Sequence, residues 1–349
     1  MRLPTLVAGI LTLVLAAVSG VMLAGRRATA QEAGPGPMQR DKLPPSATSQ
    51  QPAEQLPQAS QPLRVRTTMV NVFVTVRDRH NGIVSDLGKD DFKVFEDGAE
   101  QKIAYFTKEV DMPITLGMLI DTSGSMANIL VAEQDAAVRF IKEVMRKRDE
   151  AMVISFDLDV NLLADFTEDT SVLDRAIRRA RINAAGPVIT AGTIPQNGVI
   201  GTDLYDAVYL ACHDQLATEA GRKAVILLTD AEDNGSQMSL DDAVEAAQRA
   251  DAVIHILLLR DFEATTGVGP GVAHRMAEET GGRVIDVRNE KTLEKAFDEI
   301  SEELRSQYVL GYYPTNAKRD GTFRKIKVEV GRPNVKILAR KGYYAPSPE

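Results

Sequence analysis

Residues 114–126 read ITLGMLIDTSGSM, and this stretch decides how the rest of the chain is interpreted. Its first seven residues form a short apolar run, typical of a strand buried on both faces of a parallel sheet. A polar turn follows, and then an amphipathic pattern that predicts a helix over residues 127–147. Because open α/β sheets place their sites at the carboxyl ends of strands, three residues of the turn are candidate site residues: Asp121, Ser123 and Ser125.

These three side chains offer one carboxylate and two hydroxyls on alternate residues. Hard oxygen ligands of this kind suit Mg²⁺ or Mn²⁺ and are poor ligands for zinc or copper. The alternative is a helix N-cap, in which Asp or Ser accepts bonds from the first free amides. One residue suffices for a cap, so three at this spacing favour a metal site.

Two further segments lead to the same edge of the predicted sheet. The run KAVILLTD (223–230) reads as a buried strand that ends in Asp230. A long loop marked by Gly and Pro, residues 184–201, leads to Thr202 at the start of another predicted helix. Alone, Thr202 would be a helix cap and Asp230 a turn residue. Their shared location predicts that both join the three turn residues in one metal site.

Strand and helix patterns alternate regularly from residue 112 to residue 306, which predicts a doubly wound, mostly parallel sheet with helices on both faces. Two of the strands are close enough for a hairpin, so we expect one antiparallel edge. Besides the strands named above, the expected strands are 151–156, 160–166, 252–259 and 283–287. The other expected helices are 170–183, 203–219, 239–250, 271–280 and 290–307.

The segments on either side of this domain are rich in β patterns. The expected strands lie in residues 64–77 and 91–106 before it, and in 308–315, 322–330 and 334–344 after it. Asn81-Gly82 and Asp97-Gly98 are strong turn signals. Neither end is large enough to be stable alone. We therefore predict that residues 64–111 and 307–345 form one small antiparallel β-domain, with the α/β domain of residues 112–306 inserted between them.

The Asp-x-Ser-x-Ser pattern at Asp121, with Thr202 and Asp230 downstream in order, resembles the von Willebrand factor A domain. That resemblance implies a metal-ion-dependent adhesion site in which Ser123, Ser125 and Thr202 hold Mg²⁺ (or Mn²⁺) through hydroxyls. Asp121 and Asp230 would act directly or through water. One departure is Ala231, where the family usually has Gly; because Ala is strained at positive φ, the turn and the metal affinity are in doubt.

The flanking segments sharpen the resemblance. DFKVFEDGAEQKIAYF before the domain, and LRSQYVLGYYPT and RKGYY after it, are similar to the bacterial von Willebrand A-related family common in Acidobacteria. Membership would imply export but defines no biochemical role.

The N-terminal segment also predicts export. Residues 1–30 hold an apolar run and a small-x-small site, as in a secretory signal peptide. The run is long enough to span a bilayer, so a retained membrane tether is the alternative. Residues 31–63 are rich in Pro and Gln and read as a disordered linker. We expect a periplasmic, secreted or envelope-associated protein.

Composition and motifs exclude other classes. A net charge of −8 argues against nucleic acid as a partner. No HExxH, G-x-S-x-G or phosphate-binding loop is present, so we expect no enzyme. The basic cluster near the C-terminus favours a solvated sheet face, with an anionic polysaccharide site as the alternative: Lys318, Arg319, Arg324, Lys325, Lys327, Arg332, Lys336, Arg340 and Lys341.

The predicted function is that of an exported module that binds an unknown protein through its metal ion, which captures an acidic side chain of that partner. A structural scaffold whose metal only stabilises the fold is the rival. A hydrolase that uses the ion to activate water is a third possibility, disfavoured because no histidine base lies near these residues in sequence.

Overall fold

The computed structural model describes residues 69–108, 112–182, 202–259 and 269–347. The chain divides into two units, Met1–Leu63 and Arg64–Glu349, and all described residues belong to the second. The expected signal segment, the linker and the loop 184–201 therefore lie outside the described residues. Within those ranges no helix is long and apolar enough to cross a membrane.

A six-stranded sheet forms the centre of the α/β domain, in the order β10-β9-β8-β5-β6-β7. Its strands are β5 (Ile114–Asp121), β6 (Glu150–Phe156), β7 (Val160–Thr167), β8 (Arg222–Thr229), β9 (Ala252–Leu259) and β10 (Val284–Val287). β5 pairs in parallel with β6 and β8, and every one of its residues is buried. β7 pairs antiparallel to β6, as the close spacing of those two strands predicts.

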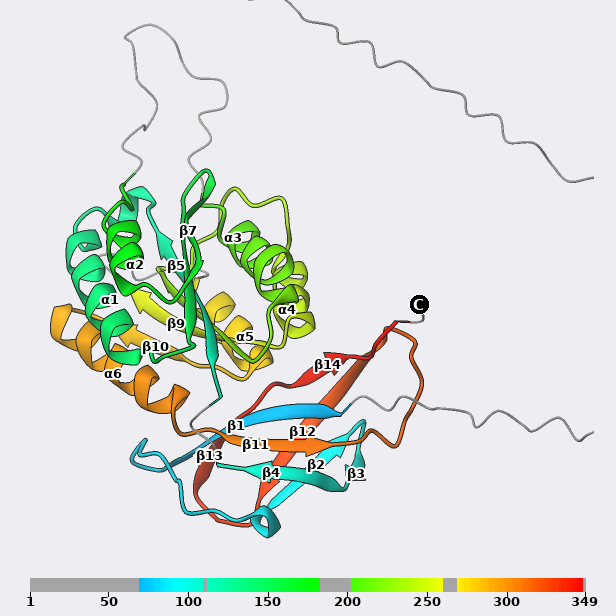
Figure 1. Cartoon of the computed structure of the whole chain (residues 1–349). Coiled ribbons are helices and arrows are strands. Elements are labelled where there is room, and N and C mark those ends of the chain that lie inside the picture. The colour runs from blue at the N-terminus through cyan, green and yellow to red at the C-terminus, as the bar shows by residue number, and fades with distance from the viewer. Residues whose placement is uncertain (1–68, 109–111, 183–201, 260–268, 348–349) are drawn as a thin grey trace, which may run out of the picture. The chain divides into compact units, whose positions relative to one another are not determined.

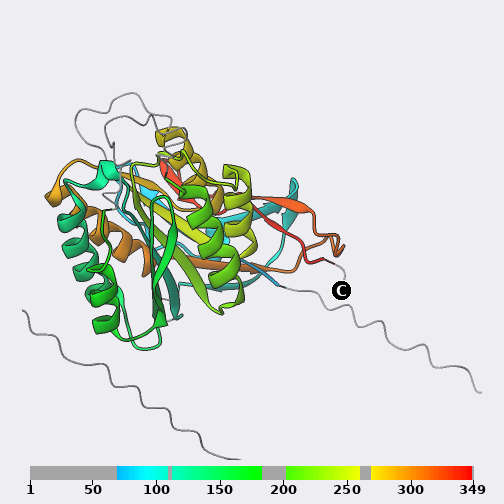
Figure 2. The same cartoon turned by 90° about the horizontal axis from the view of Figure 1, so that it is seen from above.

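Helices cover both faces of this sheet (Figures 1 and 2). One face carries α1 (Leu130–Val144), α2 (Thr170–Ile177) and α6 (Glu290–Leu304); the other carries α3 (Leu204–Leu210), α4 (Leu240–Arg249) and α5 (Gly269–Thr280). The helix expected over 203–219 is divided, because a π turn (Ala211–Gln215) and a 3-10 turn (Leu216–Thr218) follow α3. The doubly wound, mostly parallel α/β architecture is confirmed.

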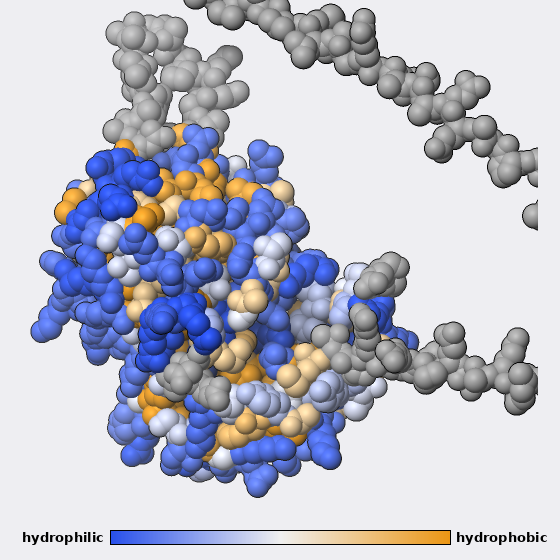
Figure 3. Space-filling model, in the orientation of Figure 1, coloured by the Kyte–Doolittle hydropathy of each residue, from blue (hydrophilic) through white to orange (hydrophobic). Residues whose placement is uncertain are grey.

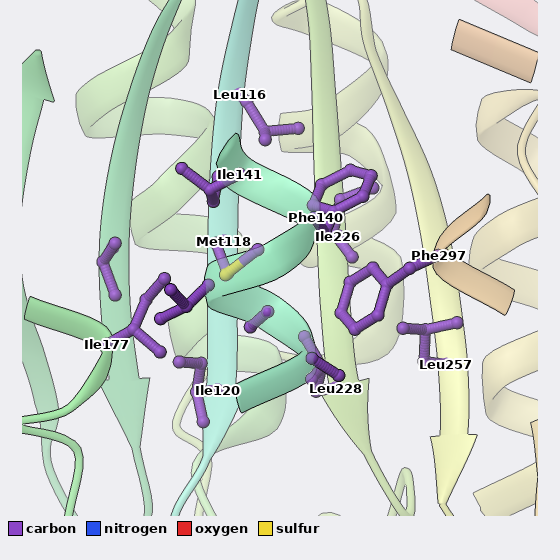
Figure 4. Packing of buried hydrophobic residues seen from close by; sticks show 14 of the residues in the cluster. Leu116, Met118, Ile120, Phe140, Ile141, Ile177, Ile226, Leu228, Leu257 and Phe297 are labelled. Carbon is purple, nitrogen blue, oxygen red and sulfur yellow. The ribbon is translucent and has the colours of Figure 1, made fainter. Parts of the chain in front are cut away.

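Apolar side chains from strands and helices interlock on each face of the sheet. Figure 4 shows one of these layers, in which Met118 and Ile120 of β5 lie beside Ile226 and Leu228 of β8 beneath α1. The rings of Phe140 and Phe297 pack with centroids 4.8 Å apart, which joins α1 to α6. Burial of a side chain of this size stabilises the fold by about 1.5–3 kcal/mol.

The two flanking segments pair with each other in antiparallel sheets. One sheet has the order β13-β1-β11-β4 and the other β14-β12-β2-β3. The strands are β1 (Val70–Asp78), β2 (Phe92–Glu96), β3 (Ala99–Gln101), β4 (Ile103–Thr107), β11 (Tyr308–Tyr312), β12 (Phe323–Val330), β13 (Val335–Leu338) and β14 (Gly342–Tyr344). β1 pairs with β11, and β2 pairs with β12, so strands far apart in sequence share one core.

The two turn signals in the N-terminal segment have different outcomes. Asp97 and Gly98, with φ of 47° and 85°, make the tight turn between β2 and β3. After the turn at Asn81 the chain forms only an isolated bridge, between Arg77 and Ile83. The second strand of that hairpin is missing because the chain leaves β1 to dock at Leu87, whose N–H is bonded to the Tyr308 hydroxyl at 3.0 Å.

Figure 3 shows hydrophilic residues over most of the visible surface of the helices, with apolar residues in smaller patches. The large apolar side chains that are exposed in the described ranges come from separate elements: Tyr105, Val131, Leu162, Met238 and Tyr313. Single exposed apolar residues of this kind are normal for a folded domain.

A buried cluster of charges joins β1 to the α/β domain. Glu303 of α6 is fully buried; it accepts a hydrogen bond from Arg77 at 2.7 Å and forms an ion pair with Arg283 at 2.8 Å. Removal of one member would leave an uncompensated charge in the interior, which commonly costs about 3–5 kcal/mol. The packing of the flanking strands on the α/β domain therefore depends on this carboxylate.

We predict that Glu303→Ala lowers the free energy of unfolding by about 3–5 kcal/mol, because both guanidinium groups lose their buried partner. Urea unfolding followed by circular dichroism measures the change. Glu294→Ala is the matched control, since Glu294 pairs with Arg139 at a site where both side chains are about half exposed, and it should cost less than about 1 kcal/mol. Equal effects of the two variants would contradict the role of the buried cluster.

Candidate functional site

Asp121 ends the central strand and is completely buried. Its Oδ1 accepts a bond from the Ser123 N–H at 2.9 Å, and its Oδ2 accepts one from the Thr229 hydroxyl at 2.6 Å. The pKa of Asp121 is raised to about 6, chiefly by burial and also by the nearby Asp230 carboxylate, although the bonds from Ser123 and Thr229 oppose this. The site therefore holds a carboxylate whose charge the protein only partly stabilises.

Ser123 and Ser125 lie above Asp121 at the surface. The backbone leaves β5 in an extended conformation at Ser123 and turns through a short 3-10 helix, Gly124–Met126. Met126 is 1% exposed and anchors this turn in the apolar core, so the two serines are presented outward. Their Oγ atoms are 3.0 Å apart. Two hydroxyls at this separation can face a common ligand.

Thr202 is brought to the same sheet edge by backbone hydrogen bonds. Its carbonyl accepts a bond from the Asn234 N–H at 3.2 Å, which ties it to the turn that follows Asp230. The next residue, Asp203, donates its N–H to the Asp157 carbonyl at 2.7 Å. The Asp157 carboxylate in turn accepts a 2.8 Å bond from Thr122, beside Asp121. The structure thus connects all three segments that contain the predicted site residues.

Asp230 lies directly after β8 and is partly exposed, and its Oδ1 accepts the Glu232 N–H at 3.1 Å. Ala231 has a φ of 61°, so it adopts the left-handed conformation that Gly would take without strain. Its N–H is bonded to the Thr229 hydroxyl, and its side chain is buried. The turn keeps its left-handed form despite the alanine.

A second buried carboxylate lies near this site. Glu133, in the first turn of α1, is 1% exposed, and neither of its oxygens has a hydrogen-bond partner among the described residues. Burial raises the pKa of Glu133 well above its usual value, and the charges of Asp121 and Asp230 raise it further. Buried carboxylates are normally paired or bound to a cation, so Glu133 indicates a shortage of positive charge here.

The donor set fits a small divalent cation. Within the described ranges no three His, Cys, Asp or Glu side chains could hold a metal by themselves, so an ion would need the hydroxyls of Ser123, Ser125 and Thr202. Both Asp121 oxygens already accept protein hydrogen bonds, which favours contact through water. A cation would offset the three acidic groups, which form no ion pair with any described basic residue: Asp121, Glu133 and Asp230.

Asp203 belongs to a neighbouring acidic group. Its pKa is raised to about 6, chiefly by burial and also by four like charges: Asp206, Asp233, Asp159 and Asp157. A carboxylate in that setting resists ionisation. Asp203 therefore adds less negative charge to the sheet edge than its sequence position suggests.

Sequence reasoning missed three residues that shape the site: Thr229, Asp157 and Glu133. Thr229 stands next to Asp230 in the quoted strand end, so its hydroxyl was a visible signal. Asp157 falls in the expected hairpin between two strands, and Glu133 falls within the expected helix. Neither position carries a pattern that distinguishes it from an ordinary surface acid.

Two residues of types that often carry chemistry lie in the core. Cys212 is fully buried, and burial raises its thiol pKa to about 12, so it is not a reactive thiol. His255 is also fully buried, and burial lowers its pKa to about 4. Neither ring nitrogen of His255 has a hydrogen-bond partner among the described residues.

The raised pKa of Asp121 predicts a pH dependence for the metal-free protein. The folded state holds this proton up to about pH 6, whereas an unfolded Asp releases it near pH 4. The stabilisation is therefore fully present below about pH 4 and is lost as the pH rises through about 6. We expect Asp121→Asn, which cannot ionise, to become more stable than the wild type by on the order of 3 kcal/mol by pH 7.

Thermal unfolding in the presence of chelator measures this difference between the two proteins. A range from about pH 4.5 to about pH 7.5 covers roughly the span between the unfolded and folded pKa values of Asp121. Asp241→Asn is the control, because Asp241 is exposed on α4 and is paired with Arg275. A stability difference between Asp121→Asn and the wild type that stays constant with pH would contradict the raised pKa.

Comparison with known proteins locates this site in a recognised domain. Residues 116–232 match the family model described as the von Willebrand factor type A domain. No protein of curated function matches the chain. Among solved structures, the conserved hypothetical protein BatB from Bacteroides thetaiotaomicron is 18% identical, with a TM-score of 0.43, and the match covers 55% of this chain and 100% of that one.

Two other solved structures are also similar. The von Willebrand domain of the type V pili tip protein Mfa5 from Porphyromonas gingivalis is 16% identical, with a TM-score of 0.40, over 55% of this chain and 94% of that one. A von Willebrand factor type A protein from Catenulispora acidiphila is 12% identical, with a TM-score of 0.45, over 81% of this chain and 75% of that one.

Proposed function

Because residues 116–232 form a von Willebrand factor type A domain, we propose that the chain is a protein-binding module that depends on Mg²⁺ or Mn²⁺. The ion is held at the sheet edge and captures an acidic side chain of a partner protein. The observation that carries this proposal is a group of buried or half-buried acids that no described basic residue neutralises, next to the half-buried Ser123 hydroxyl and the exposed Ser125 hydroxyl.

The roles of the five residues follow from their exposure and bonding. Hydroxyls of Ser123, Ser125 and Thr202 are neutral direct ligands. The carboxylates of Asp121 and Asp230 hold metal-bound waters and supply the compensating charge. Because the direct ligands carry no charge, they leave much of the positive charge of the bound ion without neutralisation. A carboxylate from outside completes its coordination, since Mg²⁺ prefers six oxygen ligands.

The surface beside the hydroxyls supports contact with a protein. Val131, in the first turn of α1, is 71% exposed, and Ala127 and Asn128 before it are also exposed. An apolar side chain next to the metal ion can add buried contact area around the partner's carboxylate. The partner that fits this edge presents an Asp or Glu flanked by apolar groups.

The rival function is a structural scaffold in which Asp203 or Glu232 closes the metal site from within the chain. Glu232 is exposed, and its backbone N–H is bonded to Asp230. Chelator distinguishes the two functions, since it abolishes partner binding in one and only lowers the melting temperature in the other.

A hydrolase has less support. Among the described residues no histidine hydrogen-bonds to a site residue; His213 bonds to Asp214, and His80 to Arg79. Export rests on the sequence alone, through the apolar run of residues 3–25. The proposal places the module in the periplasm, in the envelope or outside the cell.

We predict that Asp121→Ala weakens Mg²⁺ binding by at least about 10–100-fold, the usual cost of removing a group that orients metal ligands. The protein should remain folded, because the same change removes an unfavourable buried charge. Titration calorimetry measures the affinity, and circular dichroism checks the fold. Asp241→Ala, on exposed α4, should bind as the wild type does; unchanged affinity in the Asp121 variant would sink the assignment.

A further prediction concerns the captured carboxylate. Once a partner is identified from envelope extract, its acidic contact residues can be neutralised one at a time. One such change should reduce binding as strongly as chelator does, because it removes the ligand that reaches the ion. If every variant still binds in a Mg²⁺-dependent way, the carboxylate-capture mechanism is wrong.

A further inference from the structure

A cavity of about 200 Å³ lies where the flanking β-strands meet α4, away from the metal site. Asp251, directly before β9, lines this cavity, whereas Asp121 ends β5. Because β5, β8 and β9 are parallel, the cavity is at the amino ends of the strands and the metal site is at their carboxyl ends. An eight-residue strand separates the two ends by about 26 Å.

The lining of this cavity is strongly basic. Five cationic residues and one acidic residue, Asp251, contribute to it; the cations are Arg249, Lys318, Arg319, Arg324 and Arg340. Four of these cations belong to the C-terminal basic cluster that the sequence analysis interpreted as a solvated sheet face. The fold does not spread that cluster over one face, because Arg324 is only 2% exposed and Arg340 is largely buried.

Two of the cations are held in place by the protein. Arg324 donates to the carbonyls of Asn316 and Lys318, which fixes the loop between β11 and β12 over the cavity. Arg340 is bonded to Asp251 and donates to the Asn71 carbonyl at 2.6 Å. Burial lowers the pKa of Arg340 to about 10, which leaves it charged at neutral pH.

Two cations at the mouth are free to meet a ligand. Lys318 and Arg319 are exposed, and neither side chain forms an ion pair with any residue in the described part of the chain. They are carried on the loop that Arg324 fixes, so their approach to the cavity is set by the fold. A pair of cations positioned in this way favours a ligand with a negatively charged oxygen group.

The lining also includes an uncharged polar group. The Asn316 side chain is exposed in the lining, and its Oδ1 accepts the Lys318 N–H at 3.3 Å. Its amide N–H group can donate to a ligand hydroxyl while the neighbouring cations bind an anionic oxygen. Acidic sugars carry both groups on one small ring.

We propose that this cavity binds a single acidic sugar unit, a hydroxyl-bearing ring that carries a carboxylate or a phosphate. Lys318 and Arg319 bind the anionic group, and Asn316 binds a ring hydroxyl. The cavity is smaller than the roughly 300–1,000 Å³ of sites for drug-sized ligands, which limits the ligand to one unit. This site is independent of the metal-dependent function.

Titration calorimetry of the full chain tests the proposal with four probes: glucuronic acid, glucose 6-phosphate, glucose and inorganic phosphate. We expect one or both acidic sugars to bind, with glucose and inorganic phosphate at least about 10-fold weaker, since each lacks half of the recognised groups. Binding by glucuronic acid alone would identify a carboxylate ligand, and binding by glucose 6-phosphate alone a phosphate ligand. Absence of binding by both, or equal binding of inorganic phosphate, would overturn the proposal.

The double variant Lys318→Ala with Arg319→Ala should lower the affinity for the acidic sugar at least about 10-fold, because both cations at the mouth of the cavity are lost. The matched control is Lys327→Ala with Lys336→Ala, which removes the same net charge from exposed strand positions outside this lining. Equal loss in both variants would indicate a general charge effect and overturn the site. Asp121→Ala should leave sugar binding unchanged, which separates this site from the metal site.

Discussion

The burial of β5 on both faces is the constraint on which the rest of this structure depends. Every residue from Ile114 to Asp121 is buried, and the strand pairs with β6 on one side and β8 on the other. The last residue of such a strand cannot reach bulk water, so Asp121 keeps its carboxylate in the interior. Thr229 and the Ser123 amide satisfy its hydrogen bonds, but no described basic residue neutralises its charge.

Sequence patterns were sufficient for the architecture because burial imposes simple periodicities. The apolar run of residues 114–120 predicts the central strand, and the alternation of patterns predicts the helices on both faces. The end of α2 at Ile177, rather than near residue 183, could not be predicted. The Gln134 side chain donates to the carbonyls of Ile177 and Ala180, and this contact from another helix favours the end of α2 there.

The candidate site was predictable where its residues end strands and was hidden where its residues lie within helices or turns. Asp121 and Asp230 follow apolar strands, so their position at one sheet edge follows from topology. Glu133 occupies a helical position at which an acidic residue normally faces solvent. The buried contact of Glu303 with Arg77 was likewise hidden, since it joins residues 226 positions apart. Pairings of this kind depend on how the helices and strands pack together, and local sequence patterns do not predict that packing.

The acidic groups at the metal site connect ion binding to the stability of the fold. Burial and neighbouring like charges raise the pKa values of Asp121 and Glu133, so without a cation the folded protein favours protonation of these two groups. A ligand that binds only the folded state stabilises it by RT ln(1 + [L]/Kd), about 2.7 kcal/mol at 100 times Kd. The strained Ala231 turn adds a local cost at the same edge, of about 1–2 kcal/mol for a left-handed non-glycine residue. Both features concentrate destabilisation where the ion is proposed to bind, so the protein would reach its full stability only with that ion bound.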